Sequence, residues 1–240
     1  HIPLIHGADG SKLSKRHGAL GVEAYRDDGF LPEAVFNYLL RLGWSHGDNE
    51  IISREQATEW FDLSSVGKSA ARFDTDKLTS INGHYIRNGD NERLSKSILP
   101  IISKTLGGKV SKNAETWLKL GMDELKERAK TTLELSDSAL FYAKIRPLEI
   151  NEKAAALLSE DSLAVLHLLR ASLEGLAEWS ADPLKQAVGE FSEAQELKLS
   201  KVAQPLRAAL TGTNVSPGVF QVMAVLGREE TLGRIDDALN

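Results

Sequence analysis

A short basic segment near the start of the chain carries residue types that bind phosphate. Residues 7–19 read GADGSKLSKRHGA. Lys12 and Lys15 stand three residues apart, Ser14 lies between them, and Arg16 follows. Ammonium groups, a hydroxyl and free backbone N–H groups suit a polyphosphate whose charge moves during reaction, because a flexible loop can follow the departing group. On these residues alone, an ordinary solvated basic turn remains the alternative.

Two other motifs fail as functional sites. The segment VGKSA at 66–70 is similar to the end of a phosphate-binding P-loop. That motif requires a glycine five residues before Gly67, and this position holds Asp62. The six histidines are scattered, without a pair at i, i+4 or a neighbouring carboxylate in a zinc-ligand pattern. We therefore expect no metal site in this chain.

Composition limits the class of protein. The chain has 240 residues, of which 42% are hydrophobic, and it contains no cysteine. It has no apolar run near the roughly 20 residues that span a bilayer, so we expect a soluble globular protein without a membrane partner. The absence of cysteine suits a reducing cytoplasm, which is the compartment we expect. The net charge of -5 argues against wrapping of nucleic acid by the whole surface but allows a local basic track. Because the chain does not begin with Met, we expect a fragment of a longer protein.

The elements around the basic loop combine strand and helix signals. HIPLI at 1–5 predicts a strand, and NEIIS and RFD predict further short strands or extended pieces. A helix is expected from Pro32 to Gly43, with Val35, Leu39 and Leu42 on its inner face. Two capping signals predict two more helices after this one. The first signal is a capping box formed by Ser53 and Gln56, and the second is an N-cap at Asp74.

The remainder of the chain shows only amphipathic helix patterns. The expected helices span 94–106, 114–135, 153–158, 162–176, 183–191, 200–210, 217–226 and 229–239. The predicted fold class is therefore mainly α, with a small α+β part directly after the basic loop.

Four motifs resemble one protein family. GSKLSKRHGA is similar to the second signature of class I aminoacyl-tRNA synthetases, in the Lys-x-Ser-Lys-Arg form of the glutamyl enzymes. GFLPEAVFNYLLRLGWS (29–45), FDTDKLTSINGHYIR (73–87) and KVAQPLRAALTG (201–212) resemble bacterial glutamyl-tRNA synthetases in the same order. The resemblance covers essentially the whole chain and is weakest between residues 88 and 196. It identifies the chain as the C-terminal part of such an enzyme.

The resemblance implies a role for the loop in glutamate activation. Lys15 matches the lysine that stabilises the pyrophosphate leaving group, and Lys12, Ser14 and Arg16 match residues that hold ATP. The His-Ile-Gly-His signature of the nucleotide-binding fold is absent from these 240 residues. ATP, Mg²⁺ and glutamate are therefore expected only in the full-length ligase, and this chain alone is expected to take no cofactor and to be inactive.

The resemblance also implies four parts and a tRNA(Glu) partner. Residues 1–22 match the end of the catalytic domain, and 23–92 match a mixed α/β fold that contacts the tRNA stem. Residues 93–152 and 153–240 match two all-helical subdomains that bind the anticodon, and a monomer is expected. The alternative is a helical protein-interaction module with no tRNA role.

Alignment with the family places the anticodon readers. Arg128 matches the arginine that recognises C at the first anticodon position, although it also fits a solvated helix charge paired with Glu124. Arg207 and the turn Ser216-Pro217-Gly218-Val219 match residues that read the remaining bases. Ser216 is expected as an N-cap and Pro217 as the first helical residue, with Pro217 and Val219 contacting base planes. A well-capped helix with a surface arginine is the other interpretation.

Overall fold

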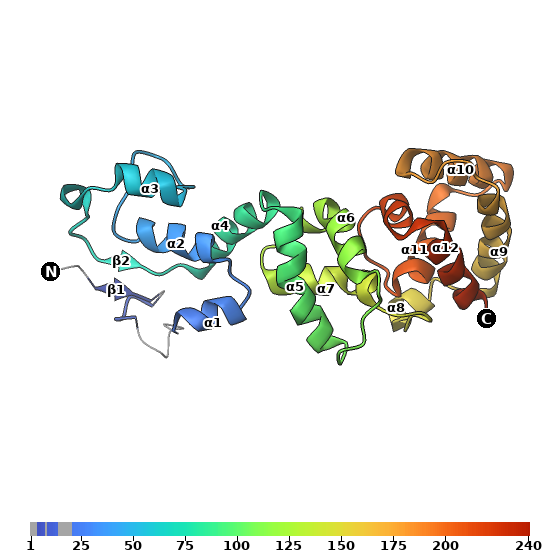
Figure 1. Cartoon of the computed structure of the whole chain (residues 1–240), viewed down its shortest axis with the longest axis horizontal. Helices are drawn as coiled ribbons and strands as arrows, with labels where there is room; N and C mark the ends of the chain where they lie inside the picture. The colour runs from blue at the N-terminus through green and yellow to red at the C-terminus, as the bar shows by residue number, and fades with distance from the viewer. Residues whose placement is uncertain (1–3, 8, 14–20) are drawn as a thin grey trace. The chain divides into compact units, whose positions relative to one another are not determined.

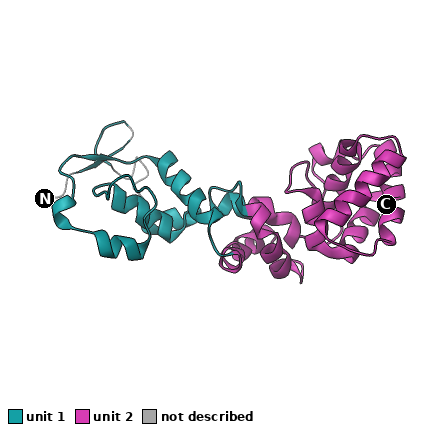
Figure 2. Ribbon diagram, turned by 90° about the horizontal axis from the view of Figure 1, so that it is seen from above, with its two compact units in different colours: residues 1–90, 126–135 teal, residues 91–125, 136–240 magenta. Residues whose placement is uncertain are grey.

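The computed structural model describes residues 4–7, 9–13 and 21–240. These residues form twelve α-helices and one two-stranded sheet (Figure 1). The expectation of a mainly α protein is thus confirmed. The chain divides into two compact units, shown in different colours in Figure 2. Unit 1 comprises residues 1–90 and 126–135, and unit 2 comprises residues 91–125 and 136–240.

Unit 1 contains the small sheet. Strand β1 (Ile5–His6) pairs in parallel with β2 (Ala71–Arg72), so that His6 lies opposite Arg72. The RFD segment thus contributes Arg72 to a strand, as expected. The other extended segment, residues 49–53, forms no strand, and buried Asn37 holds it instead. Asn37 Nδ2 donates to Glu50 O over 2.9 Å, and its Oδ1 accepts from Ile52 N over 2.8 Å.

Four helices and one short 3-10 turn complete unit 1 before residue 90. They are α1 (Val22–Asp27), α2 (Pro32–Arg41), α3 (Arg54–Trp60), η2 (Leu63–Ser65) and α4 (Thr75–Arg87). Pro32 opens α2, the Ser53–Gln56 capping box precedes α3, and Asp74 caps α4 by accepting from Lys77 N. These three sequence predictions are confirmed.

The predicted inner face of α2 is wrong at Leu39, which is 46% exposed. Tyr38 is buried in its place, together with Val35. The Tyr38 hydroxyl accepts a hydrogen bond from Asp74 N over 2.6 Å. Because its polar end has a partner, the aromatic ring can enter the core.

Unit 2 is built from helices. They are α5 (Asn91–Thr105), most of α6 (Ala114–Lys126), most of α7 (Thr132–Ala143), α8 (Glu152–Ala155), α9 (Glu160–Glu174), α10 (Ala181–Ala194), α11 (Leu199–Thr211) and α12 (Val219–Leu239). The single helix expected over 114–135 is wrong, since it is interrupted before Thr132. Thr131 Oγ1 accepts from Glu134 N, and Glu134 Oε2 accepts from Lys130 N, so these side chains start a new helix.

Helix α12 contains a break where two separate helices were expected. Gly227 has φ 78° and ψ 171°, a conformation that interrupts the helix and that glycine adopts without a Cβ clash. Beyond the break, Arg234 is only 1% exposed. Its Nη1 donates to Phe141 O over 2.9 Å and to Leu210 O over 2.6 Å, so α12 is bonded to the ends of α7 and α11.

Candidate functional site

The described half of the basic loop folds back on strand β1. Gly7 N donates to Ser11 O, Gly10 N donates to Gly7 O, and Leu13 N donates to Ile5 O, all over 2.9–3.0 Å. Gly10 has φ 80°, which the tight turn requires. Lys12 is exposed at the end of this turn. Ser14, Lys15 and Arg16 lie outside the described residues.

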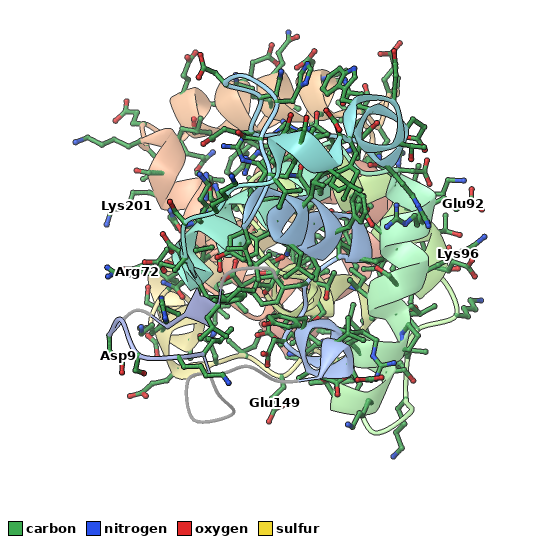
Figure 3. The ribbon with its side chains drawn as sticks, turned by 90° about the vertical axis from the view of Figure 1, so that its left-hand side faces the viewer. Asp9, Arg72, Glu92, Lys96, Glu149 and Lys201 are labelled. Carbon is green, nitrogen blue, oxygen red and sulfur yellow. The ribbon has the colours of Figure 1, made fainter. Side chains whose placement is uncertain are left out.

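An arginine that the sequence analysis did not select lies beside this loop. A Cβ placed on Gly10 would be 3.8 Å from Arg72 Nη2, and Figure 3 shows Arg72 and Asp9 on the same side of unit 1. A cavity of about 360 Å³ lies here, lined by Gly7, Leu13, Arg72 and the start of α4. The pairing of β1 with β2 brings Arg72 to the loop, and no local spacing predicts that contact.

Arg207 and Ser216, which were predicted as one site, meet within unit 2. Arg207 Nε donates to Ser216 Oγ over 3.0 Å, and Nη1 donates to Gln204 Oε1 over 3.2 Å. Among the described residues no carboxylate pairs with this guanidinium. Partial burial lowers the pKa of Arg207 because it withdraws water from the charged form. The site therefore presents a partly desolvated cation without a protein anion.

The expected cap of α12 is wrong. The N-cap is Gly218, the first helical residue is Val219, and no side chain caps the helix. Ser216 instead accepts from Arg207 and donates to Pro217 O over 2.8 Å. The Ser216 hydroxyl thus bonds to Arg207 and to the turn, and not to the N–H groups of α12. Because no side chain caps the first turn, its N–H groups stay available to an external acceptor.

Hydroxyl groups fix the turn between α11 and α12. Thr211 Oγ1 donates to Arg207 O over 2.9 Å, and Thr213 Oγ1 donates to Val215 O over 2.6 Å. Val215, which the sequence analysis did not select, is 69% exposed, whereas Val219 is only 3% exposed. The exposed aliphatic side chain of this turn is therefore Val215, and helical spacing could not reveal it because the residue lies outside the helix.

Arg128 occupies a different environment. It is exposed in the turn between α6 and α7, and this turn belongs to unit 1, whereas Arg207 belongs to unit 2. Within the described parts of the chain, Arg128 forms no ion pair with Glu124. The pairing expected for a solvated helix charge is thus absent, because the helix ends two residues before Arg128.

Two exposed lysines of unit 2 are already neutralised by one acid. Glu92 Oε1 accepts from Lys96 Nζ over 2.7 Å, and Glu92 Oε2 accepts from Lys119 Nζ over 2.8 Å. Glu92 and Lys96 are labelled in Figure 3. The two ammonium groups lower the pKa of Glu92 to about 2. These lysines are therefore less available to an external anion than Arg207.

The described part of the chain holds neither a cluster of metal ligands nor a helix that could span a membrane. Across residues 4–7, 9–13 and 21–240, no three His, Cys, Asp or Glu side chains gather closely enough to hold a metal ion. No helix in those ranges combines the length and apolar character needed to cross a bilayer.

Comparison with protein families matches two parts of the chain. Residues 93–239 match the family described as anticodon binding domain, which is more than half of the chain. Residues 1–80 match the family described as the catalytic domain of class I tRNA synthetases (E and Q). Arg207 and its turn fall within the first match, and the basic loop falls within the second.

Curated relatives align along the entire chain. Glutamate–tRNA ligase 2 of Paramagnetospirillum magneticum is 58% identical over 240 residues, covering 100% of this chain and 50% of that protein. Glutamate–tRNA ligase 2 of Zymomonas mobilis is 57% identical over 241 residues, with the same coverage. The chain thus spans about half the length of the curated relatives it matches.

Solved structures give a similar result. The crystal structure of a glutamate tRNA ligase from Elizabethkingia meningosepticum, in complex with its amino acid, has a TM-score of 0.81 and 30% identity. That of glutamate-tRNA synthetase from Elizabethkingia anophelis has a TM-score of 0.77 and 29% identity. Each match covers 100% of this chain and 50% of the other one.

Proposed function

The chain belongs to the anticodon-binding domain family, and from that premise we propose that it is the tRNA-binding part of a glutamate–tRNA ligase. Its relatives with this name share more than half of their aligned residues with it. The resemblance read from the four sequence motifs is thereby confirmed. The activity proposed for the full-length protein is activation of glutamate with ATP, followed by transfer to tRNA(Glu).

The observation that carries this proposal is the Arg207–Ser216 site. A partly buried guanidinium without a protein carboxylate favours an external acceptor, and anticodon bases and phosphates offer several. We assign Arg207 and Ser216 to polar contacts with unstacked bases, and Pro217 to an apolar contact. Val219 is assigned to the support of this turn, because a side chain with 3% exposure reaches no base without rearrangement.

The other predicted anticodon reader is Arg128. We propose that its guanidinium recognises the first anticodon base. Its exposure and its freedom from an ion pair among the described residues support this role. A planar group with several donors suits a base edge.

The remaining assignments concern the full-length enzyme. Lys15 is proposed to stabilise the pyrophosphate leaving group, with Lys12, Ser14 and Arg16 helping to hold ATP, and Mg²⁺ is expected to accompany ATP in the full-length enzyme. Arg72 is a further cation beside the loop. No metal ligand is assigned to residues of this chain.

The four-part organisation remains part of the proposal. Residues 1–22 would close the catalytic domain, 23–92 would contact the tRNA stem, and 93–152 and 153–240 would bind the anticodon. We propose a cytoplasmic monomer.

Two measurements test this function. In a gel-shift assay the chain should bind tRNA(Glu) more tightly than a non-cognate tRNA, and the affinity should fall with salt as phosphate contacts are lost. Equal or absent binding would favour a helical protein-interaction module instead. In ATP–pyrophosphate exchange, the chain alone should give no glutamate-dependent signal above a no-enzyme blank. A clear signal would refute the proposal that this chain binds tRNA but does not activate glutamate by itself.

A further inference from the structure

Two basic side chains from distant parts of the sequence converge on one glycine of unit 1. Arg87 lies in the last turn of α4, and Lys130 lies in the turn between α6 and α7. A Cβ placed on Gly83 would be 3.4 Å from Arg87 Nη1 and 3.6 Å from Lys130 Cγ. Both residues are exposed. Because Gly83 has no side chain, the guanidinium and the lysine stem share this small area of surface.

A buried asparagine fixes the position of Lys130. The Asn82 side chain is fully buried, and its Nδ2 donates to Lys130 O over 2.6 Å and to Gly29 O over 3.2 Å. Asn82 Oδ1 accepts from Leu31 N over 2.7 Å, so both ends of the amide have partners. The backbone of the turn is thus held against α4, and the main chain of Lys130 is fixed beside Gly83.

Neither Arg87 nor Lys130 forms an ion pair within the described ranges. Glu134, the acid in contact with this turn, accepts from the backbone N–H of Lys130. Two like charges carried by side chains over one small area of surface repel each other. An anion bound to both groups would remove this repulsion.

We propose that Arg87 and Lys130 together bind the phosphate backbone of an RNA. This inference rests on the proposed function, which makes tRNA the partner. A guanidinium offers a planar fork to phosphate oxygens, and an ammonium adds a compact charge. Phosphate contacts position a nucleic acid whereas base contacts specify it. The pair therefore orients tRNA on unit 1 without reading its sequence.

The test uses the double variant Arg87→Gln/Lys130→Gln of this chain. Its dissociation constant for tRNA(Glu), measured by fluorescence anisotropy over a salt series, should rise about tenfold near 0.1 M salt. The slope of log affinity against log salt should become shallower by about 1.4–1.8, which corresponds to two lost phosphate contacts.

The matched control is Arg26→Gln/Lys77→Gln. It removes the same two charge types from unit 1 at positions where Asp27 and Glu50 already pair with the cations. Its dissociation constant and salt slope should stay at the wild-type values. The single variant Lys130→Arg keeps the charge and should retain binding. Thermal unfolding of every variant shows whether the fold is kept.

The outcomes separate this inference from the proposed function. Wild-type chain that binds no tRNA contradicts both. Wild-type binding with an unchanged salt slope in the double variant overturns the phosphate site alone. A loss confined to the native anticodon, and absent for an anticodon-swapped tRNA, would mean that the pair reads bases, and this also overturns it. An equal loss for both tRNAs, with an unaffected control, supports it.

Discussion

Arg207 Nε donates a hydrogen bond to Ser216 Oγ over 3.0 Å, and this contact joins α11 to the turn that precedes α12. Nine residues separate the two partners, and Ser216 in turn donates to Pro217 O. The guanidinium is therefore held in place before any ligand binds. A group fixed in advance loses less side-chain entropy on binding, which favours a role in recognition.

Replacement of this arginine should weaken recognition of the anticodon. For Arg207→Ala in the full-length enzyme, we expect a loss of about 1–3 kcal/mol in cognate tRNA recognition, because the base-edge donors disappear. The measurement is kcat/KM for aminoacylation with native and anticodon-swapped tRNA(Glu), with ATP–pyrophosphate exchange as the control that should not change. Equal weakening for both tRNAs would mean that Arg207 contacts only phosphate. No weakening would mean that Arg207 is not part of the anticodon site.

Arg128 should control recognition of the first anticodon base. If its guanidinium recognises C there, Arg128→Gln in the full-length enzyme should lower the preference for tRNA(Glu) with C over tRNA(Glu) with another base at this position by about 1–3 kcal/mol. Charging rates for both transcripts give this ratio. Because Arg128 is exposed and unpaired within the described structure, the substitution should leave the unfolding temperature unchanged. An unchanged ratio would show that the assignment is wrong.

Lys15 should act in the transition state of adenylation. Lys15→Ala in the full-length enzyme should lower the adenylation rate by about two to three orders of magnitude and barely alter ATP affinity, since the lysine interacts with charge that develops on the leaving phosphates. Rapid-quench kinetics separate the two quantities. Lys15→Arg should restore the rate only in part, because a planar fork does not replace a point charge. A comparable loss of ATP binding would make Lys15 a ground-state anchor.

Alanine substitutions at Gly212 and Gly189 should change the free energy of unfolding in opposite directions. Gly212 ends α11 with φ 71°, and a Cβ there would lie 2.5 Å from Glu149 O. Gly212→Ala should therefore destabilise the chain by more than about 1 kcal/mol. Gly189 lies inside α10, and a Cβ there would meet nothing within 4 Å. Gly189→Ala should stabilise by about 0.5–1 kcal/mol, and urea unfolding measures both. Equal effects would contradict this account of the α11 end.

The ion pairs of Glu92 should contribute stability that disappears in acid. Its pKa falls from 4.5 to about 2 because Lys119 and Lys96 bind the carboxylate. A folded-state pKa below the unfolded value means that the contribution is complete above pH 4.5 and is lost as pH falls towards 2. Glu92→Gln should thus lower the urea midpoint at neutral pH. In acid, the urea midpoints of the variant and the wild type should become equal. Glu193→Gln, an exposed control on α10, should show no such convergence.

Short-range signals predict most of the elements around these sites. Pro32, the Ser53–Gln56 capping box and the Asp74 cap each act within one helical turn, so their effects are visible in a few consecutive residues. Gly227 likewise separates the two parts of α12, as the spacing of its apolar residues predicts. The turn before Thr132 also has a local signal, the pair Thr131 and Glu134, which the long apolar pattern of 114–135 obscured.

Contacts between distant segments have no such signal. Asn82 bonds to Lys130 across 48 residues, and Arg72 reaches the basic loop through the pairing of two short strands. Arg87 and Lys130 both lie over Gly83, where a side chain would fill the space between them. Helix α12 has Gly218 as its N-cap, and the hydroxyl of Ser216 bonds to Arg207 of α11 instead. Periodicity and capping depend on neighbours along the chain. The choice among competing hydrogen-bond partners depends on which segments the packed core brings together.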